Sequence, residues 1–503
     1  MSDATILLVT LAIYLLGMIV IGIACYKTTN TMSDYVLGGR RLNSWTTALS
    51  AQASDTSGWI VMGLPGAAYA TGMHAIWLAV GLAIGAYCNW QFIARRLRVY
   101  TEAAKDSITI PEFLENRFHD NSHILRIISA LIILVFFTVY VASGLVASGK
   151  LFEFMFGIDY QIAVLIGAFV VITYTFLGGY LAVSYTDVVQ ALIILVALIV
   201  VPIVIVSQVG GIGAIWNKMG NINPDLLDAT KTVGYNFEDG VFWETSTEGL
   251  GIIGIISLFA WGLGYLGQPH ILVRYMGMRS AREVPEARFV AIVWNNITQW
   301  GALFVGFAAI VFFTEPLADP ENAYINMVGI LFNPWVAGFM LAAVLAAMMS
   351  TVDSQLLVAS SALVEDFYRV LFRKEASEKE LVWLGRVGVL VISLIALALS
   401  YSGGSVLSIV GYAWAGFGAA LGPAMLLSLY WKRTTRTGVL WGMIVGAVTV
   451  FVWKNYIGLG LYEIIPGFVL SLLTIYVVSI LKKEPDQSIQ DEFDEVIAKT
   501  KSY

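Results

Sequence analysis

Charged residues are scarce in this chain. Asp, Glu, Lys and Arg together supply 13% of its 503 residues, whereas 58% of the residues are hydrophobic. An ordinary soluble domain carries about 25% charged residues and lacks repeated apolar runs of about 20 residues. The composition therefore excludes a soluble globular domain of this size. It predicts an all-α polytopic membrane protein embedded in a lipid bilayer.

Cysteine and histidine are also scarce. The two cysteines, Cys25 and Cys88, both lie in apolar segments, and the four histidines are scattered along the chain. This pattern gives no disulfide framework and no metal-ligand spacing. The sequence also contains no nucleophile triad, phosphate loop or zinc motif, so we expect no enzyme activity. The net charge of −6 argues against a nucleic-acid partner.

The N-terminus has no basic leader. Asp3 and no Lys or Arg precede an apolar run of about 20 residues, which is longer than the core of a signal peptide. We therefore expect a retained transmembrane helix. Hydropathy predicts about thirteen transmembrane helices. The expected spans are 4–25, 46–71, 76–94, 125–149, 160–178, 187–208, 251–273, 289–314, 334–368, 383–402, 405–431, 438–456 and 462–481.

Lysine and arginine indicate how these spans are oriented. With the N-terminus outside, four of the 29 Lys and Arg residues fall outside, and all the others, Arg274 among them, fall inside. Such an excess of positive charge on one side predicts an outside N-terminus and a cytoplasmic C-terminus. The four outside cations are Lys150, Lys218, Lys231 and Lys454.

One transmembrane domain, residues 1–481, and a cytoplasmic tail, 482–503, are expected to make up the chain. The longest outside connection, about 209–250, is polar and acidic, and we expect a solvated loop there. The tail places Ile489, Phe493 and Ile497 at intervals of four residues, which predicts a short surface helix.

Two membrane spans contain residues that interrupt helices. The first, Ala48 to Gly66, carries Asp55, four hydroxyls and a Gly-Pro-Gly cluster. A carboxylate in mid-membrane costs at least about 2.5–3.5 kcal/mol, so a function is expected to offset that cost. The second, 257–275, has three glycines and a proline within eight positions. Glycine and proline disfavour helix interiors, so both segments are expected to unwind.

The two interruptions lie five spans apart. Repeats of five spans, about 46–208 and 251–431, would therefore enter the membrane from opposite sides, with three further helices added. Secondary transporters build their binding sites from interrupted helices in such inverted repeats. The alternative is that these glycines only allow helices to pack closely.

Span nine offers oxygen ligands for a cation. Ser350 and Thr351 follow small side chains that would let another helix approach closely. Sodium is bound by hard oxygens with little net charge, and an unwound segment supplies carbonyls. The alternative is that these hydroxyls only bond to the preceding helical turn.

Several long motifs resemble the sodium/solute symporter family, and within it the proline transporters. They include ALSAQASDTSGWIVMGLPGA, TFLGGYLAVSYTDVVQ, WGLGYLGQPHIL, LAAMMSTVDSQLL and LYEIIPGF, and the likeness extends from residue 10 to about 481. The resemblance implies a leucine-transporter-type fold with a five-plus-five inverted repeat. It also implies sodium-coupled uptake of L-proline by alternating access, across the bacterial inner membrane, with no obligate protein partner.

The same resemblance implies residues for ion binding and coupling. The sodium ligands would be carbonyls of Ala53, Thr56 and Ala347, with hydroxyls of Ser350 and Thr351. Asp55, Asp187 and Arg40 match positions implicated in ion coupling, with Asp55 acting as a neighbouring charge. Asp353 departs from the family pattern. It could face a cytoplasmic water path, pair with an arginine or tune ion exit.

Proline is a zwitterion with a saturated ring, so its site needs partners for two charges and apolar walls. The resemblance implies Ser57, Gly58, Tyr140, Trp261, Tyr265 and Pro269, and the sequence adds Trp59 and Gln268. Other solutes, such as pantothenate, a monocarboxylate or a sugar, stay open as alternative substrates. A sensor or channel with the same fold is a further alternative.

Overall fold

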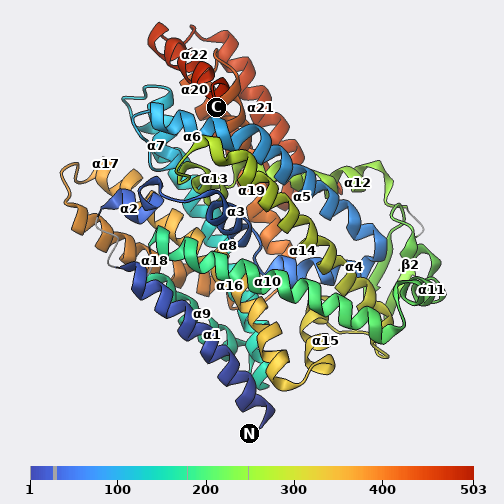
Figure 1. Cartoon of the computed structure of the whole chain (residues 1–503). Helices are drawn as coiled ribbons and strands as arrows, with labels where there is room; N and C mark the ends of the chain where they lie inside the picture. Colours follow the sequence, from blue (N-terminus) through green and yellow to red (C-terminus); the bar gives the residue numbers. More distant parts are fainter. Residues whose placement is uncertain (1, 27–30, 178, 247–248) are drawn as a thin grey trace.

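Long apolar helices make up most of the molecule (Figure 1). The computed structural model describes residues 2–26, 31–177, 179–246 and 249–503. In these residues ten helices are long and apolar enough to cross a membrane, or eleven if one bent pair counts as a single span. The all-α membrane architecture is confirmed, whereas the number thirteen is not.

Three features explain the difference: one long stretch replaces predicted spans two and three, span five is short, and span seven is the bent pair Gly251–Gly267 and Pro269–Met276. The helix α3 is only 12 residues long because it breaks after Asp55. Residues 59–103 are counted as one stretch of 45 residues, although the chain turns at Gly72. The described apolar part of α9 is the short segment Tyr160–Thr173. Each predicted span therefore contains helix, but not every one forms a separate helix that is long and apolar enough to cross a membrane.

The first half of the described chain is helical apart from one hairpin. Its helices include two π-helical turns: η2 leads directly into α4, and η4 joins α5 to α6. The elements are α1 (Asp3–Tyr26), α2 (Met32–Leu37), α3 (Ser44–Asp55), η2 (Trp59–Gly63), α4 (Leu64–Thr71), α5 (Ile76–Cys88), η4 (Asn89–Ala94), α6 (Arg95–Ala103), α7 (Ile110–Arg117), α8 (Ile124–Phe156), α9 (Tyr160–Leu177), α10 (Tyr180–Val209), α11 (Ile212–Ile222), β1 (Val233–Asn236) and β2 (Val241–Thr245).

The second half consists of helices joined by short connections, and it contains a 3-10 helix, η6, in the segment where the sequence predicts the second interruption. Its elements are α12 (Gly251–Phe259), η6 (Ala260–Gly267), α13 (Pro269–Met276), α14 (Val284–Phe312), η8 (Pro320–Asn322), α15 (Ala323–Leu331), α16 (Pro334–Ser361), η9 (Ala362–Tyr368), α17 (Arg369–Leu371), α18 (Glu378–Ser400), α19 (Val406–Tyr430), α20 (Arg436–Val452), η10 (Trp453–Ile457), α21 (Ile464–Leu481) and α22 (Gln487–Lys501).

Two helices occupy the centre of the bundle. In an apolar stretch of 18 residues in the span of α16, and in one in α19, 83% of the residues are buried. The corresponding share is 22% in α1 and 33% in each of α20 and α21. The helix α3 packs against α10, α13, α14 and α16, while α19 packs against η6 and α8. Both interrupted segments therefore lie against the most buried helices.

The connection at 209–250 is more ordered than the predicted solvated loop. It contains α11 and the antiparallel hairpin β1–β2. Trp243 Nε1 donates to the Tyr69 carbonyl at 2.7 Å, and Tyr235 OH donates to the Leu317 carbonyl at 2.6 Å. Polar composition alone predicts solvation, but these aromatic side chains fix the hairpin to α4 and to the connection after α14.

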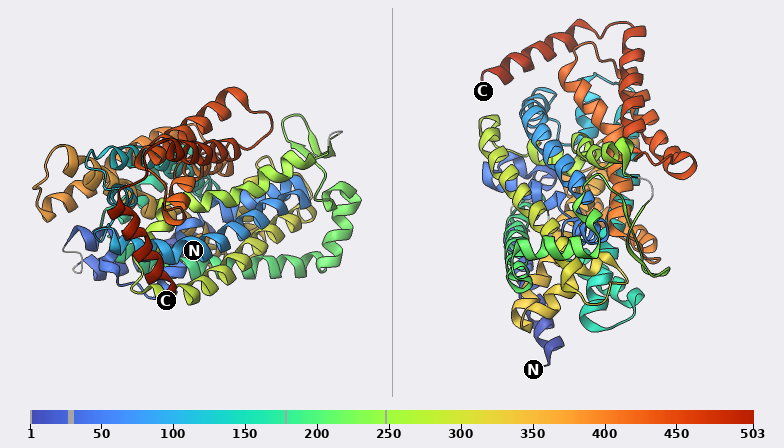
Figure 2. Two further views of the ribbon diagram at one scale, coloured as in Figure 1. Left: turned by 90° about the horizontal axis from the view of Figure 1, so that it is seen from above. Right: turned by 90° about the vertical axis from the view of Figure 1, so that its right-hand side faces the viewer.

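The two termini lie at opposite ends of the molecule (Figures 1 and 2). The tail forms the predicted helix, α22, and buries Ile489 and Phe493. Figure 2 shows this helix lying across one end of the bundle. Lys27, one of the cations predicted to face inside, lies outside the described residues.

Candidate functional site

Helix α3 stops inside the bundle, where the sequence predicts the first interruption. The Ser57 N–H would bond the Ala53 carbonyl in a continuous helix, but it donates to the Asp55 carbonyl at 3.1 Å. Thr56 has a non-helical ψ of 77°, and helix resumes at the π-helical turn beginning at Trp59. The Ala53 carbonyl is thereby free to accept bonds from outside its own helix.

Two hydroxyls of α16 contact that carbonyl. Ser350 Oγ lies 2.8 Å from Ala53 O and 3.2 Å from Ala347 O. Thr351 Oγ1 lies 3.4 Å and 3.1 Å from the same two oxygens. Four of the five predicted sodium-ligand oxygens are thus brought together. The fifth residue, Thr56, bonds its hydroxyl back to the preceding turn of α3, so only its carbonyl is left as a predicted ligand.

This oxygen cluster has the chemistry of a monovalent-cation site. Ser350 and Thr351 make the back-bond to their own helix that was the alternative interpretation, and each also contacts α3. The four oxygens are uncharged and belong to fully buried residues. Divalent metals are usually held by carboxylates, histidines or cysteines. Among the described residues, no group of three such side chains could hold a metal.

Asp55 directs its carboxylate toward the second interrupted segment. Its Oδ2 accepts from Tyr265 OH at 2.6 Å, and its backbone carbonyl accepts from Trp59 Nε1 at 3.0 Å. Within the described part of the chain, Oδ1 has no hydrogen-bond partner. Asp55 is fully buried, and it places a carboxyl group between the two breaks without bonding to Ser350 or Thr351.

The second interruption lies where the sequence predicts it. Residues 260–267 form the 3-10 helix η6, and Gln268 has an extended ψ of 107° before α13 begins at Pro269. The two helical pieces, Gly251–Gly267 and Pro269–Met276, are bent by 44° relative to each other. Two polar breaks, one in α3 and one after η6, therefore lie in the same bundle and are joined by the Asp55–Tyr265 hydrogen bond.

The 3-10 geometry separates two aromatic residues that we grouped together. At about 3.0 residues per turn, positions four apart point about 120° away from each other, instead of sharing a face as in an α-helix. Tyr265 accordingly points inward to Asp55, whereas Trp261 stacks on Tyr462 with ring centroids 5.3 Å apart. The expectation that both line one pocket overlooked this change of helix type.

Glycine in this segment also serves close packing, as the alternative interpretation proposed. A Cβ added at Gly264 would lie 1.9 Å from Trp414 Nε1, and one at Gly262 would lie 2.2 Å from the Gly81 carbonyl oxygen. Both readings of the glycines therefore hold. The residues that weaken the helix are also the ones that let α5 and α19 approach it.

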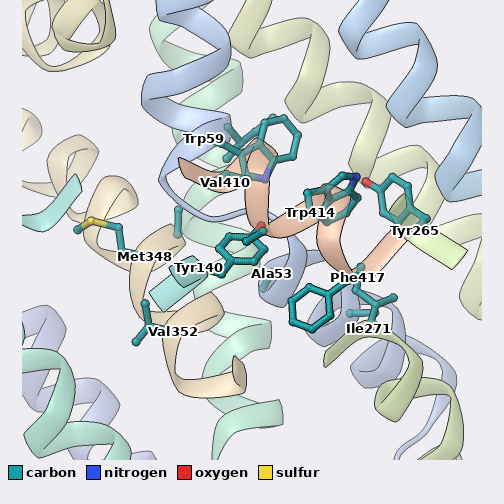
Figure 3. Close-up of a cluster of buried hydrophobic side chains, with 14 of the residues drawn as sticks. Ala53, Trp59, Tyr140, Tyr265, Ile271, Met348, Val352, Val410, Trp414 and Phe417 are labelled. Carbon is teal, nitrogen blue, oxygen red and sulfur yellow. The ribbon is translucent and has the colours of Figure 1, made fainter. Parts of the chain in front are cut away.

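Several buried polar atoms near the two breaks lack a hydrogen-bond partner among the described residues. Tyr140 lies beside Asp55 and Ser57, and its ring is 6.0 Å from the ring of His270. Figure 3 shows Tyr140 and Ala53 in the same buried cluster, with Tyr265 beside Trp414. A polar ligand could satisfy such atoms. They are Asp55 Oδ1, Gln268 Oε1 and both His270 ring nitrogens, and the hydroxyls of Ser57 and Tyr140 lie close to each other beside them.

The remaining predicted substrate residues border this cluster. Trp59 is buried, and Pro269 starts α13 with full burial. Gln268 Nε2 donates to the Trp414 carbonyl at 3.2 Å, which fixes its side chain. A Cβ added at Gly58 would lie 2.8 Å from the Ala147 side chain, so the backbone of the break closely approaches α8.

Asp187 belongs to a separate buried network. Its Oδ2 accepts from Ser50 Oγ at 2.6 Å and from Arg274 Nη2 at 3.2 Å. Arg274 Nη2 also lies 2.5 Å from Ser354 Oγ, which lies 3.4 Å from Asp353 Oδ1. All five residues are essentially fully buried. Of the three roles left open for Asp353, these contacts favour association with an arginine, although the link to Arg274 is indirect and passes through the Ser354 hydroxyl.

The distribution of Lys and Arg predicts that Arg274 lies in a connection on the inside. This prediction is wrong. Arg274 lies in α13 with no exposed surface. A count of positive charges assumes that every cation is in a loop, and it cannot recognise one paired inside the bundle. The signal that could have identified it is its position within the Gly-rich segment 257–275.

Arg40 lies apart from both sites. Its guanidinium donates to Asp106 at 2.8 Å, to the Met276 carbonyl at 2.6 Å and to the Ser107 carbonyl at 3.0 Å. Burial lowers its pKa from the usual value, with Arg98 adding to this shift and Asp106 opposing it. It therefore links the segment after α2 to the C-terminal end of α13, at the far end of this helix from the second interruption, and makes no contact with the oxygen cluster.

Comparison with known proteins decides the family. Residues 35–446 match the Sodium:solute symporter family. The chain belongs to this family. It is 48% identical over 506 residues to a sodium/proline symporter of Escherichia coli K12, covering 99% of this chain and 97% of the relative. It is also 49% identical over 484 residues to a high-affinity proline transporter of Bacillus subtilis 168, covering 95% and 98%.

Solved structures of other symporters share the fold. A Na+-coupled sialic acid symporter in a substrate-bound outward-open state aligns with a TM-score of 0.77 at 18% identity, covering 96% of this chain and 99% of that one. Mhp1, a nucleobase-cation-symport-1 family transporter, aligns with a TM-score of 0.56 at 15% identity, covering 92% and 98%. This family member therefore has the leucine-transporter-type fold that the sequence motifs imply.

Proposed function

We propose that this protein is a secondary transporter that couples inward sodium flow to the uptake of L-proline. The observation that carries the proposal is the contact of Ser350 and Thr351 with the free Ala53 carbonyl at the break in α3. The near full-length similarity to proteins named sodium/proline symporters and a proline transporter supports the substrate.

Sodium would be held by the oxygen cluster between α3 and α16. Its ligands are the carbonyls of Ala53, Thr56 and Ala347 and the hydroxyls of Ser350 and Thr351. The ion would replace the hydrogen bonds that the two hydroxyls now donate. Because Asp55 is a buried charge that does not bond to the cluster, it would favour a cation through space.

Proline would bind where the unpartnered polar atoms gather. Its carboxylate would meet backbone N–H groups at the breaks, and its ammonium would meet Asp55 or an aromatic face. Tyr265 bonds to Asp55 and so couples this site to the sodium site. The residues assigned to the site are Ser57, Gly58, Trp59, Tyr140, Tyr265, Gln268 and Pro269, with Trp261 on a different face of η6.

Transport would proceed by alternating access of two inverted repeats, about 46–208 and 251–431, within the membrane domain 1–481. Each repeat carries one interrupted helix. Sodium would join α3 to α16 and favour closure around proline, and sodium release inside would loosen that contact. Asp187 bonds to Arg274 of α13, and Arg40 bonds to Met276 at the end of the same helix. Both residues would transmit coupling through α13. The N-terminus lies outside and the tail 482–503 inside.

The experiment is uptake by proteoliposomes that contain the purified full-length protein. An inward sodium gradient should drive accumulation of labelled L-proline above the outside concentration, and equal sodium on both sides should not. Pantothenate, lactate and glucose in excess should leave proline uptake unchanged. Accumulation that is indifferent to the sodium gradient, or competition by one of those solutes, would contradict the proposal.

A further inference from the structure

The C-terminal helix α22 is docked on the end of the bundle that is proposed to face the cytoplasm (Figure 2). Its buried residues are Ile489, Phe493 and Val496. Their spacing of four and three positions places them on one face of the helix, and α22 packs against α6. A narrow apolar stripe therefore holds one side of α22.

Phe493 of this stripe covers a buried arginine. The Arg117 guanidinium lies 5.3 Å from the centre of the Phe493 ring, and the rings of Tyr100 and Phe118 lie at 5.0 Å and 4.9 Å. Its Nε donates to the Ser428 carbonyl at 3.1 Å, whereas Nη1 and Nη2 have no hydrogen-bond partner among the described residues. Aromatic faces compensate a buried cation only in part. Hydration of this guanidinium therefore opposes docking, and the docked helix is easily released.

Ion pairs hold the other side of α22. Asp494 pairs with Lys432, which lies just after the end of α19, and Lys499 Nζ lies 3.3 Å from a carboxylate oxygen of Glu102 in α6. The four side chains are 38–59% exposed. Salt screens exposed charges, with a Debye length of about 10 Å at 0.1 M and about 3 Å at 1 M. Rising ionic strength therefore weakens these pairs without weakening the apolar stripe.

The contacts of α22 join parts of the chain that belong to different repeats. The helix α6 lies in the repeat 46–208, and Lys432 directly follows the repeat 251–431. At the end of the tail, the ring centre of Tyr503 lies 5.5 Å from the guanidinium carbon of Arg282, in the connection between α13 and α14. Alternating access moves one repeat against the other. A movement that separates their cytoplasmic ends therefore has to break contacts of α22.

We propose that α22 is a latch that responds to ionic strength on the cytoplasmic side. At low ionic strength the docked helix holds the ends of the two repeats together and slows inward opening. As ionic strength rises, the ion pairs weaken and the helix is released. An isolated helix of 15 residues is marginally stable in water, so the released segment also loses helix. The effect on uptake rests on the proposed function, whereas the docking itself does not.

Amide hydrogen exchange of residues 487–501 in the purified full-length protein tests the docking. At constant sodium, exchange should be at least about two- to fivefold faster in about 500 mM KCl than in about 50 mM KCl. Lys432→Glu should give this faster exchange already at low salt, and adding Asp494→Lys should restore slow exchange by reversing the pair. Arg373→Glu is the matched control and should change nothing, since Arg373 is an exposed cation that pairs with Glu380 and not with α22.

Exchange that is indifferent to KCl and to Lys432→Glu overturns the latch and leaves the proposed function standing. The effect on transport is measured as sodium-driven proline uptake by proteoliposomes, with osmolality balanced by sucrose. Uptake should be about two- to fivefold faster with about 500 mM KCl inside than with about 50 mM, and in Lys432→Glu it should be fast at both. An unchanged uptake rate when exchange shows that α22 is released overturns the regulatory role. Absence of sodium-driven uptake in every variant overturns the proposed function itself.

Discussion

At the scale of single residues, the proposed sodium site depends on a carbonyl that has no partner in its own helix. Ala53 O is available because the Ser57 N–H bonds elsewhere, and Ser350 and Thr351 lie close enough to use it. Residue types and the interrupted span predict that hydroxyls and carbonyls meet here. The direction of Asp55 could not be predicted, because it depends on Tyr265, 210 positions away in the sequence.

Removing one hydroxyl should weaken sodium selectively. Ser350→Ala should raise the sodium concentration for half-maximal uptake about tenfold, because a hydrogen-bonding contact contributes about 1–1.5 kcal/mol. Sodium titration of proline uptake measures this. Ser360→Ala is the matched control, since Ser360 is fully buried in the same helix, donates to the Leu357 carbonyl of the preceding turn and does not contact Ala53. An unchanged sodium dependence in Ser350→Ala would remove this residue from the site.

Arg274 should be important for stability because it pairs with the buried carboxylate of Asp187 and is linked to that of Asp353 through the Ser354 hydroxyl. Arg274→Met leaves Asp187 and Asp353 without a cation, and breaking a buried pair costs about 3–5 kcal/mol. Thermal unfolding in detergent should show a large loss. Adding Asp353→Asn should recover part of it, because one uncompensated charge is removed. Arg279→Met, at a 58% exposed side chain, should change little. Failure of Asp353→Asn to recover any stability contradicts the pairing.

At the scale of elements, the type of helix in the second interruption decides what each side chain contacts. Glycine and proline content predicts that the segment is irregular, and it is. Composition does not distinguish an unwound loop from a 3-10 helix, so Trp261 was grouped with Tyr265 although they face different spaces. The hairpin β1–β2 was missed for a related reason, since its aromatic contacts with α4 are long-range.

The close approach of α19 to η6 gives a direct prediction. Gly264→Ala would place a methyl group 1.9 Å from Trp414 Nε1, so the two elements must separate. Overpacking of this kind destabilises by about 1–3 kcal/mol. Fluorescence-detected size exclusion after heating should show a lower unfolding temperature. Gly213→Ala in α11, where nothing lies within 4 Å of the added Cβ, should be neutral. Equal behaviour of the two variants would contradict the packing described for η6.

At the scale of the whole molecule, composition alone predicts the class of protein, since only a membrane protein is so apolar and so poor in charge. The long motifs predict the fold family, which the comparisons confirm. The number of spans was less predictable, because broken and bent helices do not follow a fixed length. Orientation rests on the distribution of Lys and Arg and on termini at opposite ends of the molecule.

Orientation can be tested at the two ends of the chain. In a background without Cys25 and Cys88, Ser2→Cys should react with a membrane-impermeant thiol reagent in intact cells. Ser502→Cys should react only after the membrane is permeabilised. Ser2 and Ser502 are both exposed, so access depends on the side of the membrane alone. The reverse pattern would show that the charge distribution was misread.

The central claim is that sodium and proline bind to one coupled pair of sites joined through α3. Calorimetric titration of the purified protein measures this most directly, with proline titrated at several sodium concentrations and sodium at several proline concentrations. Thermodynamic linkage requires the two effects to be equal. We predict that saturating sodium tightens proline binding at least about tenfold, and that proline tightens sodium binding by the same factor. Proline affinity that is the same with and without sodium would contradict the account.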